Sequence, residues 1–559
     1  MIVILPVAYL MIGSFYLKVG GVSLTFPQFL NTITSQQTAS LLSTTLLLAL
    51  GNAAVAILVG TVYTWIIVRT DIPGKRLFDT LSVLPLTMPF LVKAFSWILV
   101  FSPQIGLGNI AFESITGLDG PFNIYTFEGL IFAMSLGAIP IVYLTLKPVI
   151  MSVDPSLEEA SRIAGKGVLK TLFRVTFPVI LPAMLSAFVL VTVFGLGNFD
   201  YPLMLGGNNI KTLATEVYYL LFHQLPPAYG QAAAIGIIYL VMTLAAITFY
   251  LYFTRKAYKF VVVTGKAPRP TLYKLGKWKH FAFAVCFTVL FLGFILPFGG
   301  LVLMSLASSY TVYGHNVIVT WSIDNYVKAL NLPMFFNAVT NTVVLGFASA
   351  VIATLLAALL AYAALKSRVR GARLIEYISA IPLAFPGIIY GLALFWTFLF
   401  LPGISDLLYG TVWPLVMALV VIRLPYSVRM ISGSLMQISD DLEAAARVAG
   451  ASRLRSLRRV ILPLLKSGLL NSFEYTFINS LRELGAVILL VTPGTIVLTS
   501  LLLNLYSQHA SALGIVAAAS VMLCVMIMLV LLLVPLFQRL MSWGNRVIAS
   551  RRKEPLEKT

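Results

Sequence analysis

Long apolar stretches recur along the whole chain, and short polar segments separate them. Most stretches reach the roughly 20 residues that a helix needs to cross a bilayer at about 1.5 Å rise per residue. The pattern predicts an all-α membrane protein with about twelve transmembrane helices. The expected spans are 1–17, 40–68, 77–101, 128–150, 177–205 and 230–254, followed by 281–306, 337–365, 374–401, 411–432, 463–491 and 511–537.

The two halves of the chain are copies of one another. Gly74 and Pro85 recur 297 residues later as Gly371 and Pro382. An offset of 285 residues aligns Leu157, Glu158, Ala160, Ala164, Gly165 and Pro178 with Leu442, Glu443, Ala445, Ala449, Gly450 and Pro463. Each half has an even number of expected spans, so the repeats enter the membrane in the same direction. Two parallel six-helix repeats favour a central pathway between the halves.

Cations cluster in alternate loops, which places those loops in the cytoplasm. The clusters lie at 69–76, 162–174, 366–373 and 447–459, and the opposite loops carry few cations. We therefore expect both termini to be cytoplasmic in a multi-pass protein of the cell membrane. The expected domains are a first transmembrane domain (1–254), a basic cytoplasmic linker (255–280), a second transmembrane domain (281–537) and a basic cytoplasmic tail (538–559).

The first expected span is shorter than its counterpart. Ile4-Leu5-Pro6 matches Ile295-Leu296-Pro297, but the second copy has about a dozen more apolar residues upstream. This difference indicates that the chain starts late within the repeat. A signal peptide at 1–17 is less favoured, because a basic leading segment and a small-residue cleavage site are missing.

The composition limits the classes of function that we expect for this chain. With 59% hydrophobic and 11% charged residues, the chain leaves no stretch for a sizeable soluble domain. The net charge of +19 does not indicate nucleic-acid binding, because the cations are spread over short loops. Cys286 and Cys524 lie in apolar stretches, and the four histidines are far apart, so we expect no catalytic residue, no bound cofactor and no metal site.

Two cytoplasmic loops have the same unusual sequence. The first begins Asp154-Pro155-Ser156 and runs to Gly165, and the second runs from Asp440 to Gly450. Asp154 and Asp440 are expected to cap short helices, and the two glycines are expected to end them. Pro178 and Pro463 are expected in the first turn of the membrane helix that follows each loop, where a missing N–H costs little. The small residues between cap and glycine offer a thin face to another protein.

These loops resemble the Glu-Ala-Ala loops of binding-protein-dependent ABC importer permeases. That loop reads Glu-Ala-Ala, three residues, Gly, nine residues and then Ile-x-Leu-Pro, and the second copy departs from it because Ala444 takes the glutamate position. The resemblance implies the type I importer permease fold in each half and a coupling helix that docks on an ATPase. The coupling residues that it implies are Glu158, Glu159, Ala160, Gly165, Pro178, Glu443, Ala444, Ala445, Gly450 and Pro463.

The resemblance also implies the partners. No Gly-x-x-x-x-Gly-Lys-Ser/Thr motif occurs in this chain, so ATP is expected to bind and be hydrolysed on a partner. We expect two copies of an ABC ATPase subunit, an extracytoplasmic solute-binding protein and the lipid membrane as partners, and no nucleic acid. The chain itself is then a transport subunit and not an enzyme.

The fifth span of each half carries polar residues that hydrocarbon would penalise. Such residues usually face an interior cavity, so they are candidates for the substrate pathway. They are Asn198, Asp200, Glu474, Asn479, Arg482 and Glu483. The alternative is that Arg482 pairs with a neighbouring acid and only fixes helix packing. Arg423 and Arg429 are expected at the membrane interface instead.

The cargo is less well determined by the sequence. The fused layout and the segments around Phe199 and Arg482 resemble the iron(III) branch of the family, with thiamine, polyamine, phosphonate and sulfate permeases as alternatives. An ion-coupled secondary transporter also has parallel six-helix halves, but it would lack the duplicated docking loops. A membrane-embedded enzyme would need a cluster of His, Asp or Cys residues that the sequence does not show.

Overall fold

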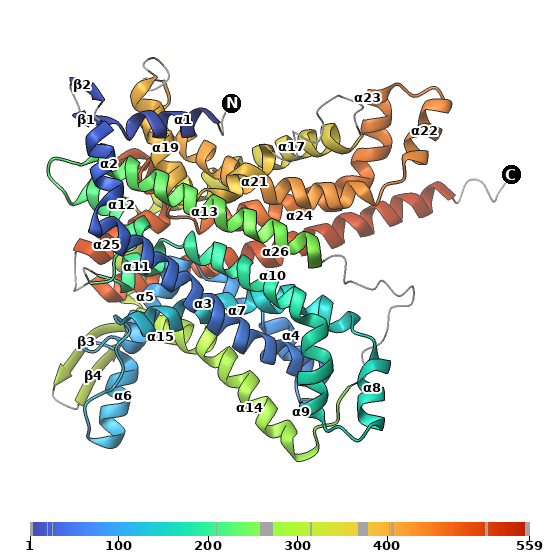
Figure 1. Ribbon diagram of the computed structural model, residues 1–559, viewed down its shortest axis with the longest axis horizontal. Helices are drawn as coiled ribbons and strands as arrows, with labels where there is room; N and C mark the ends of the chain where they lie inside the picture. Colours follow the sequence, from blue (N-terminus) through green and yellow to red (C-terminus); the bar gives the residue numbers. More distant parts are fainter. Residues whose placement is uncertain are drawn as a thin grey trace.

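Helices make up most of the described chain in the computed structural model (Figure 1). The structure describes residues 4–18, 21–24, 26–207, 209–257, 272–313, 316–366, 378–401, 403, 407–508 and 512–553. The all-α class predicted from the apolar pattern is confirmed. Of the predicted linker, 258–271 lie outside the described residues, as do 554–559 of the predicted tail.

The duplication is visible as pairs of equivalent helices. In chain order the pairs are α3 (Gln36–Arg69) and α17 (Phe335–Lys366), α5 (Phe90–Phe101) and α19 (Gly387–Phe400), α7 (Phe127–Ser152) and α21 (Trp413–Met436), α10 (Phe177–Leu196) and α24 (Leu462–Leu481), α12 (Leu213–Phe222) and α25 (Leu498–Gln508), and α13 (Tyr229–Ala257) and α26 (Leu513–Lys553). The first residues of each pair follow the offset of 297 or 285 residues found in the sequence to within one or two positions.

Fewer helices than predicted are long and apolar enough to cross a membrane. Among the described residues eight qualify, or nine if the pair Lys75–Thr87 and Phe90–Phe101, bent by 100°, counts as one broken span. The first expected span forms only α1 (Ile4–Gly13), and α19 has 14 residues. The 20-residue α24 fails because of its polar side chains. Length and composition alone therefore overstate the number of regular spans.

Two antiparallel hairpins were not expected. β1 (Tyr16–Lys18) pairs with β2 (Gly21–Leu24), and β3 (Ala307–Tyr313) pairs with β4 (Asn316–Trp321). Each follows the first helix of a half, which is α1 or α15 (Leu296–Leu306), and precedes a short helix, α2 (Phe26–Thr34) or α16 (Asp324–Leu330). The repeat thus includes these hairpins, and both lie at the same end of the molecule (Figure 1).

The first helix of each half packs against the other half. α1 lies on α19, where a Cβ on Gly13 would come within 2.4 Å of the Trp396 ring. α15 lies on α5, where a Cβ on Gly300 would come within 2.9 Å of Val100. Glycine at both contacts lets the backbones approach closely, which is how helices associate in lipid. Each half therefore packs against the first helix of the other half.

A hydrogen bond between distant helices is repeated in both halves. The backbone N–H of Leu213, at the start of α12, donates to Thr45 Oγ1 at 3.0 Å. In the second half, the N–H of Leu498 donates to Thr342 Oγ1 at 2.8 Å. Both threonines are buried, so each satisfies a helix N-terminus that water cannot reach.

Three π turns explain how prolines fit into long helices. They are η5 (Phe291–Ile295), η2 (Leu172–Thr176) and η7 (Leu457–Ile461), and the second residue after each is Pro297, Pro178 or Pro463. A proline lacks its N–H and its ring clashes with the carbonyl four residues earlier, so a locally wider turn relieves the clash. Pro178 and Pro463 stand in the first turn of α10 and α24, as expected, and each of these helices continues directly from the π turn before it.

We predict that Thr45→Val lowers the stability of the protein by about 1–3 kcal/mol, because a buried N–H loses its acceptor. Thr342→Val should have a similar effect. Thermal unfolding of the full chain in lipid nanodiscs checks this, with the exposed Thr116→Val as the matched control. Equal midpoints for all three variants and the parent would contradict it.

Candidate coupling site and transport pathway

The two loop helices lie at one end of the molecule (Figure 1). In the first half α8 (Pro155–Ile163) is followed by α9 (Val168–Thr171), and in the second half α22 (Asp440–Val448) is followed by α23 (Arg453–Ser456). The hairpins, α1 and α12 lie at the opposite end. A partner that approached the end that carries α8 and α22 would reach both loop helices.

The helix caps follow the sequence in all but one position. Asp154 Oδ1 accepts from the N–H of Ser156 at 2.9 Å, and this bond lowers the pKa of Asp154. In the second loop the cap is Ser439, whose Oγ accepts from Asp441 N–H at 3.2 Å, so the assignment to Asp440 is wrong by one residue. Gly165 and Gly450 end the helices with φ of 74° and 82°, a conformation that glycine adopts most readily.

Glu158 is buried within the protein and does not face a partner. Only 1% of it is exposed, and its carboxylate lies 3.6 Å from the Arg69 guanidinium at the end of α3. Thr176, in the π turn before α10, donates to the same carboxylate at 2.8 Å. Arg69 also donates to the Val153 carbonyl at 2.9 Å. One side chain thus joins α8 to two membrane helices.

The second half has a weaker version of this anchor. Lys366, the counterpart of Arg69, donates to the Ile438 carbonyl at 3.1 Å. Glu443, the counterpart of Glu158, is half-buried and accepts from Tyr362 at 3.5 Å, which is a long hydrogen bond. The two coupling loops are therefore equivalent in position and unequal in attachment.

The outer faces of α8 and α22 expose larger apolar side chains. Leu157 and Ile163 are 48% and 87% exposed, and their counterparts Leu442 and Val448 are 47% and 89% exposed. The predicted coupling residues Glu159, Ala160, Ala444 and Ala445 are also exposed. Sequence reasoning missed the four larger apolar residues, although their exact 285-residue spacing was a usable signal.

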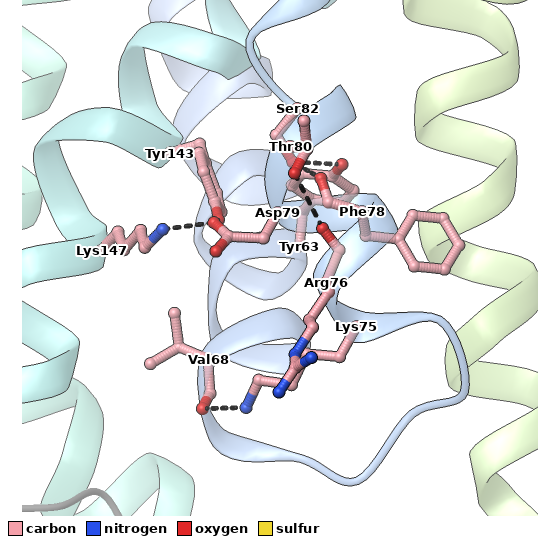
Figure 2. A network of polar contacts seen from close by, with 10 residues as sticks. All are labelled: Tyr63, Val68, Lys75, Arg76, Phe78, Asp79, Thr80, Ser82, Tyr143 and Lys147. Carbon is pink, nitrogen blue, oxygen red and sulfur yellow. Dashed lines mark hydrogen bonds and ion pairs between the residues drawn. The ribbon is translucent and has the colours of Figure 1, made fainter. Parts of the chain in front are cut away.

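A polar network holds the first helix of the broken span (Figure 2). Asp79 on α4 (Lys75–Leu81) accepts from Tyr143 and forms an ion pair with Lys147, both on α7. On the same helix Lys75 donates to the Val68 carbonyl at 2.8 Å. Because α7 runs directly toward α8, this network fixes the approach to the first coupling loop. The sequence pattern did not identify it.

The pathway candidates meet between the halves. Arg482, just after α24, donates to the Leu86 carbonyl in η1 (Leu84–Thr87) of the first half and to Asn479 Oδ1 at 2.7 Å. Its guanidinium carbon lies 5.5 Å from the centroid of the Phe90 ring. Within the described ranges of the chain, Arg482 forms no ion pair with an acid, and it contacts the first half instead.

Glu483 pairs with Arg423 of α21, and both side chains are largely buried. Arg423 lies in the middle of α21, so the expectation that it lies at the membrane interface is wrong. No neighbouring residue in the sequence points to its acidic partner. Asn198 Oδ1 accepts from the N–H of Tyr201 at 3.1 Å and orients α11 (Asp200–Leu205). Among the described residues, no hydrogen bond joins Glu474 to this group.

The duplicated helical fold and its paired loop helices define the permease component of an ABC importer. The family described as the binding-protein-dependent transport system inner membrane component matches residues 56–258 and 351–543. These two matches cover more than half of the chain, one in each repeat. The chain belongs to this family.

Individual relatives are more distant. A ferric transport system permease protein FbpB of Actinobacillus pleuropneumoniae is 26% identical over 83% of this chain and 65% of its own length. An Fe(3+)-transport system permease protein FbpB 2 of Haemophilus influenzae is 26% identical over 81% of each chain. A probable sulfate transport system permease protein of Chlorokybus atmophyticus is 32% identical over 33% of this chain and 63% of its own.

Among solved structures, a bacterial ABC transporter involved in the import of the acidic polysaccharide alginate aligns with 48% of this chain and 99% of its own. The sequence identity is 22% and the TM-score is 0.39. The chain spans slightly less than two thirds of the length of the first two ferric relatives, at 65% and 66%.

We predict that Arg69→Met destabilises the first coupling loop by about 3 kcal/mol, because it leaves the buried Glu158 carboxylate without its cation. Lys366→Met should cost less, because Glu443 is only half-buried. Hydrogen exchange of the backbone amides in 155–163 and 440–448 checks this in the full chain. Equal loss of protection in the two loops would contradict the difference in attachment.

Proposed function

We propose that this chain moves a small solute, with iron(III) as the best candidate, into the cytoplasm. An external binding protein delivers the solute, and two copies of a separate ABC ATPase dock on α8 and α22. The observation that carries this proposal is the pair of equivalent, exposed apolar faces at one end of the molecule. In this proposal ATP binds only the partner, and this chain binds no cofactor or metal of its own and no nucleic acid.

The charge distribution supports an orientation. The loops that contain α8 and α22 carry Arg174, Arg447 and Arg459 among their cations, so this end is proposed to face the cytoplasm. Helix α26 ends at the same end, which supports a cytoplasmic C-terminus of a multi-pass inner-membrane protein. A cytoplasmic N-terminus stays a prediction, because α1 lies toward the opposite end. The domain division at 1–254, 255–280, 281–537 and 538–559 belongs to the same proposal.

The helix connections suggest how closure of the ATPase reaches the membrane. α9, η2 and α10 are continuous in the chain from Val168 to Leu196, and Thr176 within them holds Glu158 of α8. A displacement of α8 therefore pulls on α10 directly and on α3 through Arg69. In the second half, α23, η7 and α24 are continuous in the same way, with the looser anchor at Glu443.

The two docking faces are chemically unequal. Glu159 is exposed on α8, and alanine takes its place on α22 as Ala444. A cation on the ATPase surface would thus gain a carboxylate partner only in the first half. We propose that apolar contacts dominate docking in both halves and that Glu159 adds an electrostatic contact in one.

The relatives favour iron(III) over other cargo. The ferric permeases align over 81–83% of this chain, which includes both halves, whereas the sulfate permease aligns over 33%. Thiamine, polyamine, phosphonate and sulfate-type anions remain the alternatives within the class. An ion-coupled secondary transporter would have no use for two exposed loop helices of this kind.

We predict that Ile163→Asp and Val448→Asp each lower both ATPase binding and uptake at least about 10-fold, because a charge would be buried in an apolar contact. The measurements are the amount of the cognate ATPase that copurifies with the full chain, and solute uptake. The control is Leu118→Asp, which alters an apolar residue that is 65% exposed and follows α6 (Leu107–Thr116), a helix at the opposite end. Full uptake in the two loop variants, or uptake without the ATPase, would contradict the proposal.

For the cargo, a strain without this chain should lose most of its uptake of radiolabelled iron(III) and keep its uptake of sulfate. Restoring the gene should restore iron uptake. The reverse result, with sulfate uptake lost and iron uptake intact, would replace iron(III) by a sulfate-type anion.

A further inference from the structure

Lys93 and Tyr201 are a pair of buried polar residues that lie near the same glycine in the first half. Each is only 1% exposed, Lys93 on α5 and Tyr201 on α11. Both face Gly137 of α7: a Cβ on this glycine would lie 3.0 Å from Tyr201 Oη and 3.8 Å from Lys93 Nζ. A side chain at 137 would therefore crowd the phenol and the ammonium group.

The polar atoms of this pair lack hydrogen-bond partners among the described residues. The same holds for Asp200 Oδ1, next to Tyr201, and for Arg423 Nε. A buried cation inside a membrane is costly, and such groups are normally paired or placed along a substrate path. A structural role would require partners, and these atoms have none in the described chain.

The pair is continuous with the polar group between the halves. The Phe90 ring lies 6.2 Å from the Tyr201 ring and 5.5 Å from the Arg482 guanidinium carbon, so it touches both groups. Lys93 and Arg482 are near enough for their charges to repel, and Asp200 interacts with the charges of Glu483 and Arg482. The cluster therefore draws residues from α5 and α11 of one half and from α21 and the end of α24 of the other.

The charges in this cluster do not balance. Arg423 and Glu483 form an ion pair, which leaves Lys93, Arg482 and Asp200. Two cations then face one carboxylate. The unpartnered atoms show the same bias, with Lys93 Nζ, Tyr201 Oη and Arg423 Nε as donors and Asp200 Oδ1 as the acceptor. Excess donors and excess positive charge suit an anion with several acceptor oxygens.

The second half has no such site at the equivalent positions. Tyr390 stands for Lys93, Ala486 for Tyr201 and Gly387 for Phe90 at the repeat offsets. A Cβ on Gly387 would lie 2.8 Å from Glu483 Oε1 and 3.0 Å from Ala486 N, so the Glu483 carboxylate and the backbone at Ala486 fill the place that Phe90 takes in the first half. The second half thus lacks the lysine and the tyrosine of this group and has Tyr390 and Ala486 in their places.

We propose that Lys93, Tyr201 and Arg482 bind an oxyanion on its way through the membrane. When the oxyanion carries a proton, the Asp200 carboxylate accepts a hydrogen bond from it. This inference rests on the proposed transport function and specifies the chemistry of its pathway. The oxyanion is either the cargo itself or a ligand that travels with iron(III) as an anionic complex. In the described conformation Lys93 and Tyr201 are closed to solvent, whereas Arg482 and Asp200 are partly exposed, so the anion reaches the inner residues when the halves part.

The test is a binding measurement on the full chain in lipid nanodiscs, without the ATPase. Sodium sulfate, sodium phosphate or iron(III) citrate is titrated at constant ionic strength against sodium chloride, and the shift of the unfolding temperature gives the affinity. We expect stabilisation by at least one of these anions. Sulfate or phosphate acting alone indicates a free oxyanion, and iron(III) citrate acting alone indicates an anionic complex.

Two variants separate binding from packing. Lys93→Met should weaken binding about 10- to 100-fold, and Tyr201→Phe about 3- to 10-fold, since each removes one donor. Without added anion both variants should be at least as stable as the parent, because the groups removed are unpartnered. Lys328→Met, which removes an exposed lysine, should bind as the parent does.

The proposal is overturned if no anion stabilises the parent, or if the variants bind as tightly as the parent. A loss of stability in both variants without anion would assign the two residues to packing and would also overturn it. Because no ATPase is present, these outcomes are independent of the proposed function. Failure of that function would instead appear as ATPase-independent uptake by the parent.

Discussion

The carboxylate of Glu158 sits where three parts of the first half meet. Arg69 brings the end of α3 to it, Thr176 brings the π turn before α10, and Glu158 itself belongs to α8. An ion pair with so little exposure carries a high desolvation cost, so it persists only while all its partners stay in place. That constraint makes α8 move with the membrane helices, and the transport account depends on it.

The duplication preserves geometry more closely than chemistry. The hydrogen bonds of Thr45 and Thr342, the π turns before Pro178 and Pro463 and the left-handed glycines after both loop helices recur in each half. The threonines satisfy backbone N–H groups that lipid cannot solvate, the π turns accommodate the prolines, and the glycines adopt a positive φ. Changes at these positions are therefore costly. Side chains toward the centre have diverged, and the polar cluster around Arg482 and Lys93 is built unequally by the two halves.

Much of this was predictable because it depends on local rules. Apolar length, the positions of glycine and proline and the repeat offsets identified the helical class, the duplication and both loop helices. The count of regular spans was overestimated, because a 100° bend and short helices such as α1 leave the same apolar signature as a full span. Long-range partners were missed: nothing near Arg423 in the sequence points to Glu483, and nothing near Lys93 points to Tyr201. Ser439, one residue before the expected cap, shows that even local boundaries shift.

The central claim is that the two loop helices approach each other when the ATPase closes. Spin labels on cysteine substitutions at the exposed Ala164 and Ala449 measure the distance between α8 and α22, and both native cysteines are buried. In the full transporter in nanodiscs, the distance should shorten when ATP binds and lengthen again after hydrolysis. A distance that stays constant while the same sample hydrolyses ATP and transports its solute would contradict the account.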